Sequence, residues 1–288
     1  MLGDFEYARA RSVKQGCKLL AKAGGEGAVL AGGTDLLVNL RNGRASAKLL
    51  VDLKSVKSLD RLTVSPKNGA WIGASVPLNE IALHRGLRSR YPGLAEAAWT
   101  VGSYPIRNRA TLVGNLCNAS PAADTAPPLL VLDAVLEVSS PRGERTVPVR
   151  DLFLGVKRTS LAKDEVVTAV RVPPVSAATR TAFLKQQRVR GHDLAILNVA
   201  GLYDTESGSL RVAVGSCAVT PVLLPPLPEP VRTDAGIDDL ARALNEIAQR
   251  TVSPISDVRA SAEYRRALLP VLLRRLVETL LQPGEVRR

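Results

Sequence analysis

The stretch from Ile106 to Leu130, IRNRATLVGNLCNASPAADTAPPLL, places closely spaced small and polar residues directly before an apolar segment. Thr111 and Asn115 offer side-chain hydrogen bonds, and Gly114 lets a backbone or ligand approach closely. Asp124 offers a carboxylate that accepts hydrogen bonds from hydroxyl groups such as those of a ribose. Two interpretations stay open: a ligand-binding loop, or a long loop whose asparagines and aspartate satisfy backbone groups.

A second turn of this kind lies upstream, where AGGTDL spans residues 31–36. It follows a predicted strand, residues 28–31, and precedes a predicted helix that is capped by Thr34 and ends at Asn42 and Gly43. Free amides and the dipole at a helix start favour an anion, and glycines let a phosphate come close, although a Gly pair also fits an ordinary tight turn. Two such loops from separate subdomains would clamp a dinucleotide between them. The turn is neither a P-loop nor a GxGxxG motif.

The chain has 288 residues, of which 45% are hydrophobic, which is enough for two or three subdomains with buried cores. Its beginning lacks the apolar core of a signal peptide, and no apolar run approaches the roughly 18 residues of a membrane span. We therefore expect a cytoplasmic protein without a transmembrane segment. Three scattered cysteines and two histidines make a metal site built from this chain unexpected.

The net charge of +12 favours an acidic counterpart: nucleic acid, an acidic partner subunit or an anionic cofactor. With 3% aromatic residues the chain has no stacking platform for bases, and it has no nucleic-acid-binding motif, so we expect no nucleic acid. Two interpretations stay open for four arginines: Arg107, Arg109, Arg188 and Arg190. They bind an acidic partner or the flavin phosphates, or they form an ordinary solvated basic surface.

The remaining pattern predicts a mixture of strands and helices. The expected strands are residues 48–56, 70–78, 129–140, 145–153, 165–174 and 210–219. Residues 194–204 fit a strand or a helix, and residues 172–181 form the best candidate linker. Residues 93–102 and 257–281 are expected helices, and the second carries two apolar ladders at four-residue spacing. Pro270 lies inside that helix, so we expect a kink or a break there.

Four segments resemble, in order, the FAD-binding subunits of the molybdenum hydroxylases, a family that includes the medium subunit of bacterial carbon monoxide dehydrogenase and the flavin domain of xanthine dehydrogenase. They are VLAGGTDLLV, IGASVPLNEI, the stretch quoted first, and SPISDVRASAEYRRALLPVLLRRLVE. The resemblance implies an α+β protein with a vanillyl-alcohol-oxidase-type FAD-binding fold. Two α+β subdomains, 1–58 and 59–175, would hold FAD, and residues 178–288 would form a C-terminal α+β domain.

The resemblance also implies an FAD-dependent oxidoreductase subunit. Electrons would pass from substrate oxidation at molybdenum through [2Fe–2S] clusters to FAD and then to an external acceptor. The implied partners are a small [2Fe–2S] subunit and a large molybdopterin subunit, arranged as a dimer of heterotrimers. This chain would contribute no catalytic acid or base, because the electron chemistry belongs to the flavin.

Carried over residue by residue, the resemblance implies a set of cofactor contacts. The first loop would cradle the FAD pyrophosphate, the second would be its counterpart, and Lys185 would place a positive charge near the flavin ring. The implied residues are Val29, Leu30, Ala31, Gly32, Gly33, Thr34, Asp35, Leu36, Val101, Gly102, Thr111, Gly114, Asn115, Cys117, Asp124, Thr168 and Lys185. Thr168 falls where the family has an apolar residue.

One departure from the family pattern lies inside the second loop. Val113 stands where the family has the first of two glycines, which motivates an alternative in which the chain is a docking scaffold with weak or lost FAD binding. Cys117 in the same loop is expected to be a small buried side chain rather than a redox nucleophile.

Overall fold

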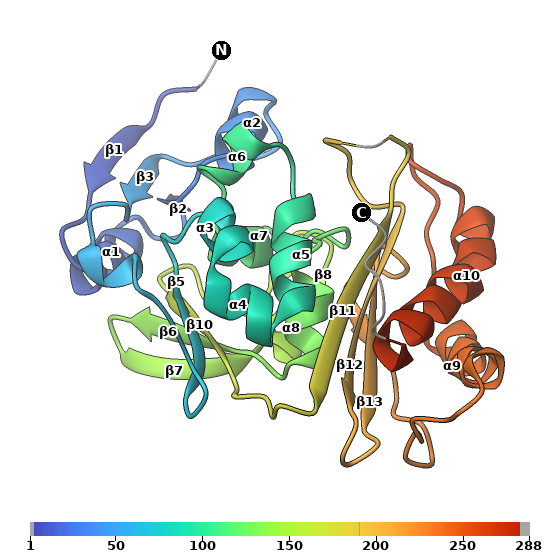
Figure 1. Ribbon diagram of the computed structural model, residues 1–288. Coiled ribbons are helices and arrows are strands. Elements are labelled where there is room, and N and C mark those ends of the chain that lie inside the picture. Colours follow the sequence, from blue (N-terminus) through green and yellow to red (C-terminus); the bar gives the residue numbers. More distant parts are fainter. Residues whose placement is uncertain (1–2, 190, 283–288) are drawn as a thin grey trace.

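The computed structural model describes residues 3–189 and 191–282, and its three main β-sheets follow one another along the chain (Figure 1). The outer ends of the first and third predicted domains and Arg190 lie outside the described residues. Helices and strands are mixed throughout, which confirms the α+β class. The domain boundaries at 58/59 and 175/178 stay a prediction, although each sheet lies within one of the three predicted ranges.

The first sheet is parallel, with the strand order β1-β3-β2. Its strands are β1 (Glu6–Arg9), β2 (Gly27–Leu30) and β3 (Leu49–Asp52), and its helices are α1 (Val13–Lys22) and α2 (Leu36–Arg41). Helix α2 ends as predicted, with Asn42 as its C-cap and Gly43 in the left-handed region at φ +65°. The predicted cap Thr34 is wrong. Asp35 is the N-cap and makes no side-chain capping bond, because the turn at Gly33 (φ +75°) delays the start of the helix.

The second sheet is antiparallel, with the order β4-β5-β10-β6-β7. Its strands are β4 (Leu62–Ser65), β5 (Gly69–Gly73), β6 (Val135–Ser140), β7 (Gly143–Pro148) and β10 (Val166–Val172). Six short helices separate β5 from β6: α3 (Leu78–Leu83), α4 (Arg85–Arg90), α5 (Pro92–Thr100), α6 (Tyr104–Arg107), α7 (Leu112–Cys117) and α8 (Ala126–Val131). The connections also contain η1 (Lys57–Leu59), η2 (Val149–Asp151) and the small hairpin β8 (Phe153–Gly155) and β9 (Arg158–Thr159).

The predicted strand over residues 129–140 is wrong in its first part. Residues 129–131 belong to α8, and β6 begins only at Val135. Two prolines, Pro127 and Pro128, open this helix, where their fixed φ angle suits the first turn and their missing amides cost nothing. Every residue of α8 is buried, so its apolar run carries no helical periodicity that a sequence could reveal.

The third sheet is antiparallel, with the order β11-β12-β13-β14, and two long helices cover it (Figure 1). Its elements are β11 (Thr179–Gln186), β12 (Leu197–Asp204), β13 (Leu210–Gly215), β14 (Val222–Leu223), α9 (Ile237–Thr251) and α10 (Ala262–Leu281). Residues 194–204 therefore contain a strand, and the last residues of the predicted linker already belong to β11. The apolar ladders of α10 pack against this sheet in a core separate from the one shared by the first two sheets.

Helix α10 begins at Ala262, five residues later than predicted, because the hydroxyl of Ser261 caps it by accepting a hydrogen bond from the Tyr264 amide. Of the two outcomes expected at Pro270, a kink or a break, the break does not occur, since the helix is continuous through that residue. A proline cannot donate to the carbonyl four residues earlier, which here is Arg266. The side chain of Gln249 on α9 donates to that carbonyl instead, at 3.4 Å. A neighbouring helix thus replaces part of what the proline removes.

Candidate functional site

The two glycine-containing loops predicted from the sequence lie against each other. The first loop follows β2 at the carboxyl end of the parallel sheet, and the second runs from the end of α6 through α7 to the start of α8, so that Gly114, Asn115 and Cys117 lie in a short helix. A Cβ atom added to Gly32 would stand 2.1 Å from the carbonyl oxygen of Arg109 and 2.9 Å from the Cα atom of Ala110. No side chain fits in that space, so Gly32 permits a backbone-to-backbone contact between the first two subdomains. We call this the glycine contact.

The second loop presents one face to the outside and one to the core. The hydroxyl of Thr111 caps α7 by accepting from the amide of Gly114 at 3.0 Å. The side-chain carbonyl of Asn115 accepts from the hydroxyl of Thr125 at 2.7 Å, which leaves its amide hydrogens without a described partner. Gly114, Asn115 and Cys117 are partly exposed, whereas Val113 is only 6% exposed and belongs to the core. The residue that departs from the family pattern therefore points away from the exposed face.

Arg107 fixes the turn at Val101 and Gly102. Its guanidinium donates to the carbonyl oxygens of Val101 and Gly102 at 3.2 and 3.4 Å, and to the side chain of Asn79 at 2.9 Å. It also lies over the ring of Trp99, 4.4 Å from the centroid. With 5% exposure, Arg107 is neither part of a solvated surface nor available to a partner. In the sequence, the only signal of this buried position is the presence of Trp99 and Tyr104 shortly before Arg107.

Asp124 and Lys185 form a buried ion pair between the second loop and β11. The ammonium Nζ of Lys185 lies 2.7 Å from Oδ2 of Asp124, and the two side chains are 4% and 6% exposed. The other carboxylate oxygen of Asp124 accepts from the amide of Asn198 on β12 at 2.8 Å. Burial raises the pKa of Asp124, and Lys185 and Asn198 oppose that rise. We call this group of three residues the ion-pair contact.

The remaining donors of Lys185 are also used. Its ammonium donates to the carbonyl oxygens of Thr100 at 3.1 Å and of Asp193 at 2.9 Å, which with Asp124 accounts for all three of its hydrogens. In this arrangement Lys185 acts on its surroundings through its charge, which Asp124 largely balances, and offers no free hydrogen bond. The carbonyl of Thr100 directly precedes Val101, so the ion-pair contact adjoins the turn that Arg107 holds.

Lys157, which the sequence did not single out, lies between the two loops. It occupies the β8–β9 turn at φ +58°, and its ammonium donates to the side chain of Asn118 at 2.8 Å. Burial lowers the pKa of Lys157, and the nearby carboxylate of Asp35 opposes that change. A cation from a third segment therefore faces both Asp35 in the first loop and Asn118 after α7.

Two predicted residues are less closely tied to this region. The hydroxyl of Thr168 donates to the carbonyl of Glu137 within the second sheet, at a β-bulge in β10, and forms no hydrogen bond with a described residue of either loop. Burial raises the pKa of the Cys117 thiol to about 12. The thiol therefore stays protonated at neutral pH, as expected of a small packing side chain rather than a nucleophile.

The other two described arginines that the sequence singled out, Arg109 and Arg188, have different surroundings. Arg109 is exposed and forms no ion pair with a described residue, whereas Arg188 is bound by Asp193 at 2.8 Å. That pairing occupies Asp193, so the exposed neighbour His192 has no carboxylate partner there.

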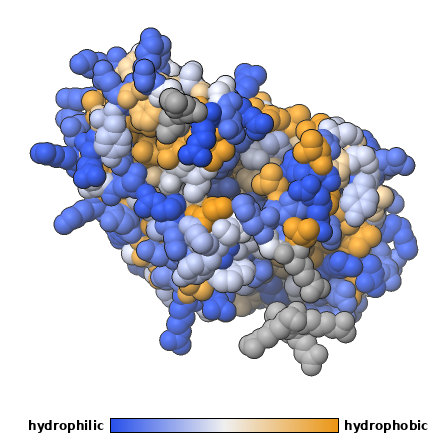
Figure 2. All heavy atoms as spheres, turned by 90° about the horizontal axis from the view of Figure 1, so that it is seen from above, coloured by the Kyte–Doolittle hydropathy of each residue, from blue (hydrophilic) through white to orange (hydrophobic). Residues whose placement is uncertain are grey.

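The structure therefore joins most of the predicted residues into one region. The glycine contact links the first loop to the second, Arg107 links α6 to the turn at Val101, and the ion-pair contact continues to the third sheet. Seen from above, hydrophilic side chains project from the rim of this face of the molecule, with apolar side chains among them toward its middle (Figure 2).

Comparison with known proteins assigns both halves of the chain. Residues 3–175 match the family described as the FAD binding domain in molybdopterin dehydrogenase, and residues 182–280 match the CO dehydrogenase flavoprotein C-terminal domain. The chain is 29% identical to the putative xanthine dehydrogenase FAD-binding subunit of Escherichia coli over 279 residues, which is 95% of each chain. It is 32% identical to the nicotine 6-hydroxylase medium subunit of Paenarthrobacter nicotinovorans, covering 96% of this chain and 97% of that one.

The fold agrees with these matches. Carbon monoxide dehydrogenase from Hydrogenophaga pseudoflava superposes with a TM-score of 0.90 at 27% identity, over 97% of this chain and 98% of that chain. The chain therefore belongs to the FAD-binding domains of the molybdopterin dehydrogenases, which confirms the family, the fold and the cofactor FAD inferred from the sequence. It is an FAD-containing oxidoreductase subunit of the molybdenum hydroxylase type.

The described residues fit such a cofactor. Gly32 and Gly33 are partly exposed just before α2, and Gly114 and Asn115 are partly exposed in the second loop, which the glycine contact joins to the first. Within the described residues, no cluster of three or more possible metal ligands occurs, and none of the helices is both long and apolar enough to cross a membrane.

Proposed function

We propose that this chain binds FAD between its two glycine-containing loops and passes electrons, which arrive from [2Fe–2S] clusters of a partner subunit, to an external acceptor. Its partners are a small [2Fe–2S] subunit and a large molybdopterin subunit, assembled as a dimer of heterotrimers in the cytoplasm. The relatives named medium subunit or FAD-binding subunit support this assignment.

The chain's own residues have distinct parts in the proposed site. Residues 29–36 would hold the pyrophosphate at the start of α2, where the helix dipole favours an anion. Gly114 and the amide of Asn115 would contact the cofactor from the opposite side, and Lys157 would add a positive charge between the loops. FAD itself supplies the redox chemistry when bound, and the protein supplies binding, orientation and electrostatics.

The observation that carries this proposal is the glycine contact. Any Cβ atom at Gly32 collides with the backbone of the second loop, so the two loops can lie against each other only because residue 32 has no side chain. The loops are thus held edge to edge, with Gly32, Gly33 and Gly114 partly exposed. The buried position of Val113 speaks against the scaffold alternative, because its side chain occupies the core and not the space beside Gly114.

Titration with FAD tests the proposal. The purified chain should take up one FAD per molecule, gain the yellow flavin absorbance and unfold at a higher temperature, since a ligand that binds only the native state stabilises it. Asn115→Leu should weaken this binding, and Asn68→Leu, on an exposed turn away from the loops, is the matched control. Protein that gains neither absorbance nor thermal stability would contradict the proposal and favour the scaffold.

Co-expression with the adjacent genes tests the electron-transfer part. The complex should contain two further subunits, and addition of the substrate oxidised by the large subunit should bleach the flavin absorbance. A complex whose iron–sulfur absorbance changes while its flavin stays oxidised would show that FAD is bound but lies outside the electron path.

A further inference from the structure

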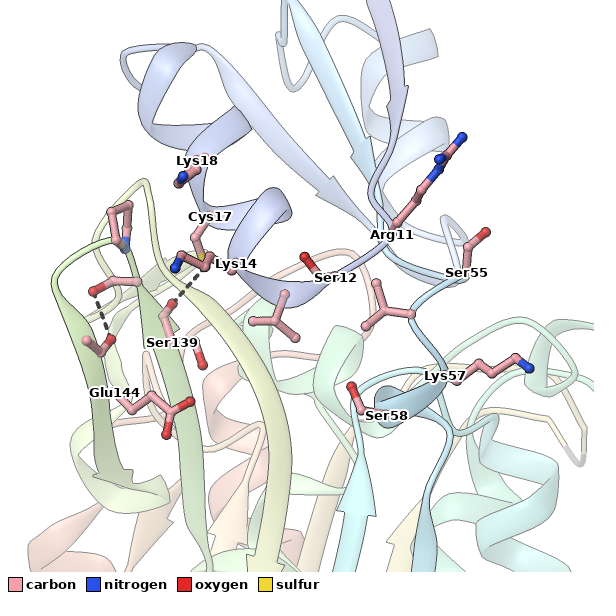
Figure 3. Close-up of a pocket in the computed structure, with 15 residues that line it drawn as sticks. Arg11, Ser12, Lys14, Cys17, Lys18, Ser55, Lys57, Ser58, Ser139 and Glu144 are labelled. Atoms are coloured by element: carbon pink, nitrogen blue, oxygen red, sulfur yellow. Dashed lines mark hydrogen bonds between the residues drawn. The ribbon is translucent and has the colours of Figure 1, made fainter.

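A groove separate from the proposed flavin site lies at the carboxyl ends of β1 and β3 in the parallel sheet, whereas the first glycine-containing loop follows β2. The chain leaves β1 through Arg11 and Ser12 into α1, and leaves β3 through Ser55 into η1, while the turn of the β6–β7 hairpin forms the opposite wall (Figure 3). The groove has a volume of about 910 Å³, within the range of small-molecule sites. None of its lining residues belongs to either glycine-containing loop.

The groove carries positive charge that the protein does not balance. Arg11, Lys14, Lys18 and Lys57 line it, against the single carboxylate of Glu144. None of these four cations forms an ion pair with any residue in 3–189 or 191–282.

Two carboxylates nearby are already neutralised by other arginines. Asp164 and Glu165 lie close enough to the groove to help burial raise the pKa of Cys17, which is on its wall. Arg142 binds Asp164 through two hydrogen bonds, and Arg145 binds Glu165 in the same bidentate manner. The hairpin's two arginines are thus paired with carboxylates just before β10, whereas Lys14 and Lys18 on α1 and Lys57 on η1 form no ion pair with a described residue.

The cations stand at two ends of the groove. Lys14 and Lys18 lie beside the hairpin. Arg11 and Lys57 stand at the opposite end, where their side chains extend outward from the groove, and the hydroxyls of Ser12 and Ser58 lie between the two pairs (Figure 3). The oxygen of Ser12 accepts from the Gln15 amide, so its hydrogen is free to donate into the groove. Cations at both ends suit an extended anion better than a single phosphate.

We propose that this groove binds a small molecule with two or more phosphate groups, at a site independent of the flavin. The lysines at one end and Arg11 at the other bind separate phosphates, and the serine hydroxyls donate to the oxygens between them. The side chain of Lys54, which contacts Asp52 at 2.9 Å and the carbonyl of Ala31 at 3.4 Å, separates the groove from the first glycine-containing loop.

Calorimetric titration of the FAD-saturated protein with tripolyphosphate and with ATP tests the proposal. Saturating FAD first keeps the probes out of the flavin site. We expect saturable binding of one probe per chain, weakened about tenfold or more in the double variant Lys14→Ala/Lys18→Ala, since two charge-assisted contacts are lost. The control is Lys22→Ala/Lys67→Ala, which removes the same charge from exposed lysines outside the groove.

Three results would overturn the proposal: no saturable binding of either probe, equal weakening by the control variant, or binding that disappears once FAD is saturating. The last result would assign the probe to the flavin site. Flavin uptake is measured separately by absorbance, so a chain that fails to bind FAD would refute the proposed function. Even then, the dependence of polyphosphate binding on Lys14 and Lys18 would show whether the groove is the binding site.

Discussion

The glycine contact and the ion-pair contact both join parts of the chain that lie far apart in sequence, but they do so by opposite means. At Gly32 the absence of a side chain lets two backbones touch. At Asp124, Lys185 and Asn198 three side chains fill the space between the second loop and the third sheet. The first contact depends on one residue having no side chain, and the second depends on a buried charge having its partner. They should therefore fail differently when altered.

The largest effect is expected at the ion-pair contact. Lys185→Met leaves the carboxylate of Asp124 buried without its counter-ion, and such losses cost about 3–5 kcal/mol. Urea unfolding should show a destabilisation of that size, and Lys185→Met/Asp124→Leu should recover much of it because no charge remains buried. A double variant no more stable than the single one would mean that Asp124 does not need Lys185.

The next effect is expected at the glycine contact. Gly32→Val forces the two loops apart, and overpacking of this kind costs about 1–3 kcal/mol. If this free energy destabilises the arrangement of the loops that binds FAD, the affinity for FAD drops by about 10- to 100-fold in an absorbance titration. Gly3→Val is the control, because it introduces the same side chain at a glycine where a Cβ atom meets nothing within 4 Å. Unchanged FAD affinity in Gly32→Val would separate the contact from cofactor binding.

A smaller effect is expected between the two contacts. Arg107→Met removes hydrogen bonds from a cation to the side chain of Asn79 and to the carbonyls of Val101 and Gly102. We expect a loss of about 2 kcal/mol, typical of buried hydrogen bonds to charged groups. The near-ultraviolet circular dichroism of Trp99, which stacks on this guanidinium, should change as well. If stability falls while the dichroism is unaffected, the stacking is not maintained in solution.

The smallest effect concerns acid stability at the start of the third sheet. Hydrogen bonds from the amide and hydroxyl of Ser207, and from the hydroxyls of Ser176 and Thr179, lower the pKa of Asp204 from 3.8 to about 2. Because the folded pKa is the lower one, this carboxylate stabilises the fold above about pH 4, and the stabilisation is lost as the pH falls toward 2.

Asp204→Asn should therefore lose less stability than the parent protein between pH 5 and pH 3, as followed by urea unfolding. Asp60→Asn, an exposed carboxylate whose side chain has no described hydrogen bond, is the control. Equal acid sensitivity of the parent protein and Asp204→Asn would exclude this role.

The sequence predicted the parts of the site that depend on local chemistry. Glycines before a helix and the end of α2 at Asn42 are each set by a few neighbouring residues, so their pattern is visible in the chain. The contact between Gly32 and Arg109 was expected only in outline, as two loops that meet. The resemblance to a known family supplied what the local pattern could not, namely the cofactor and the order of the domains.

The sequence did not predict which partner each polar side chain would have. The sequence left ribose hydroxyls and backbone groups of the loop as two options for Asp124, yet its oxygens bind the side chains of Lys185 and Asn198, which lie 61 and 74 residues away. For Arg107 the sequence left three surroundings open: a partner subunit, a flavin phosphate or solvent. In the structure its guanidinium instead packs against Trp99. Such pairings depend on how three sheets stack, and no spacing within the chain encodes that arrangement.

Pro270 shows the same limit in α10, with a consequence of its own. A proline inside a helix is usually considered only for the hydrogen bond it removes. The carbonyl that loses its donor is, however, an acceptor that a neighbouring helix can bind at one position only. Gln249 reaches that carbonyl from α9. A sliding of one helix past the other by a single turn would leave the carbonyl of Arg266 without this donor, so the proline helps to specify the register in which the two helices pack.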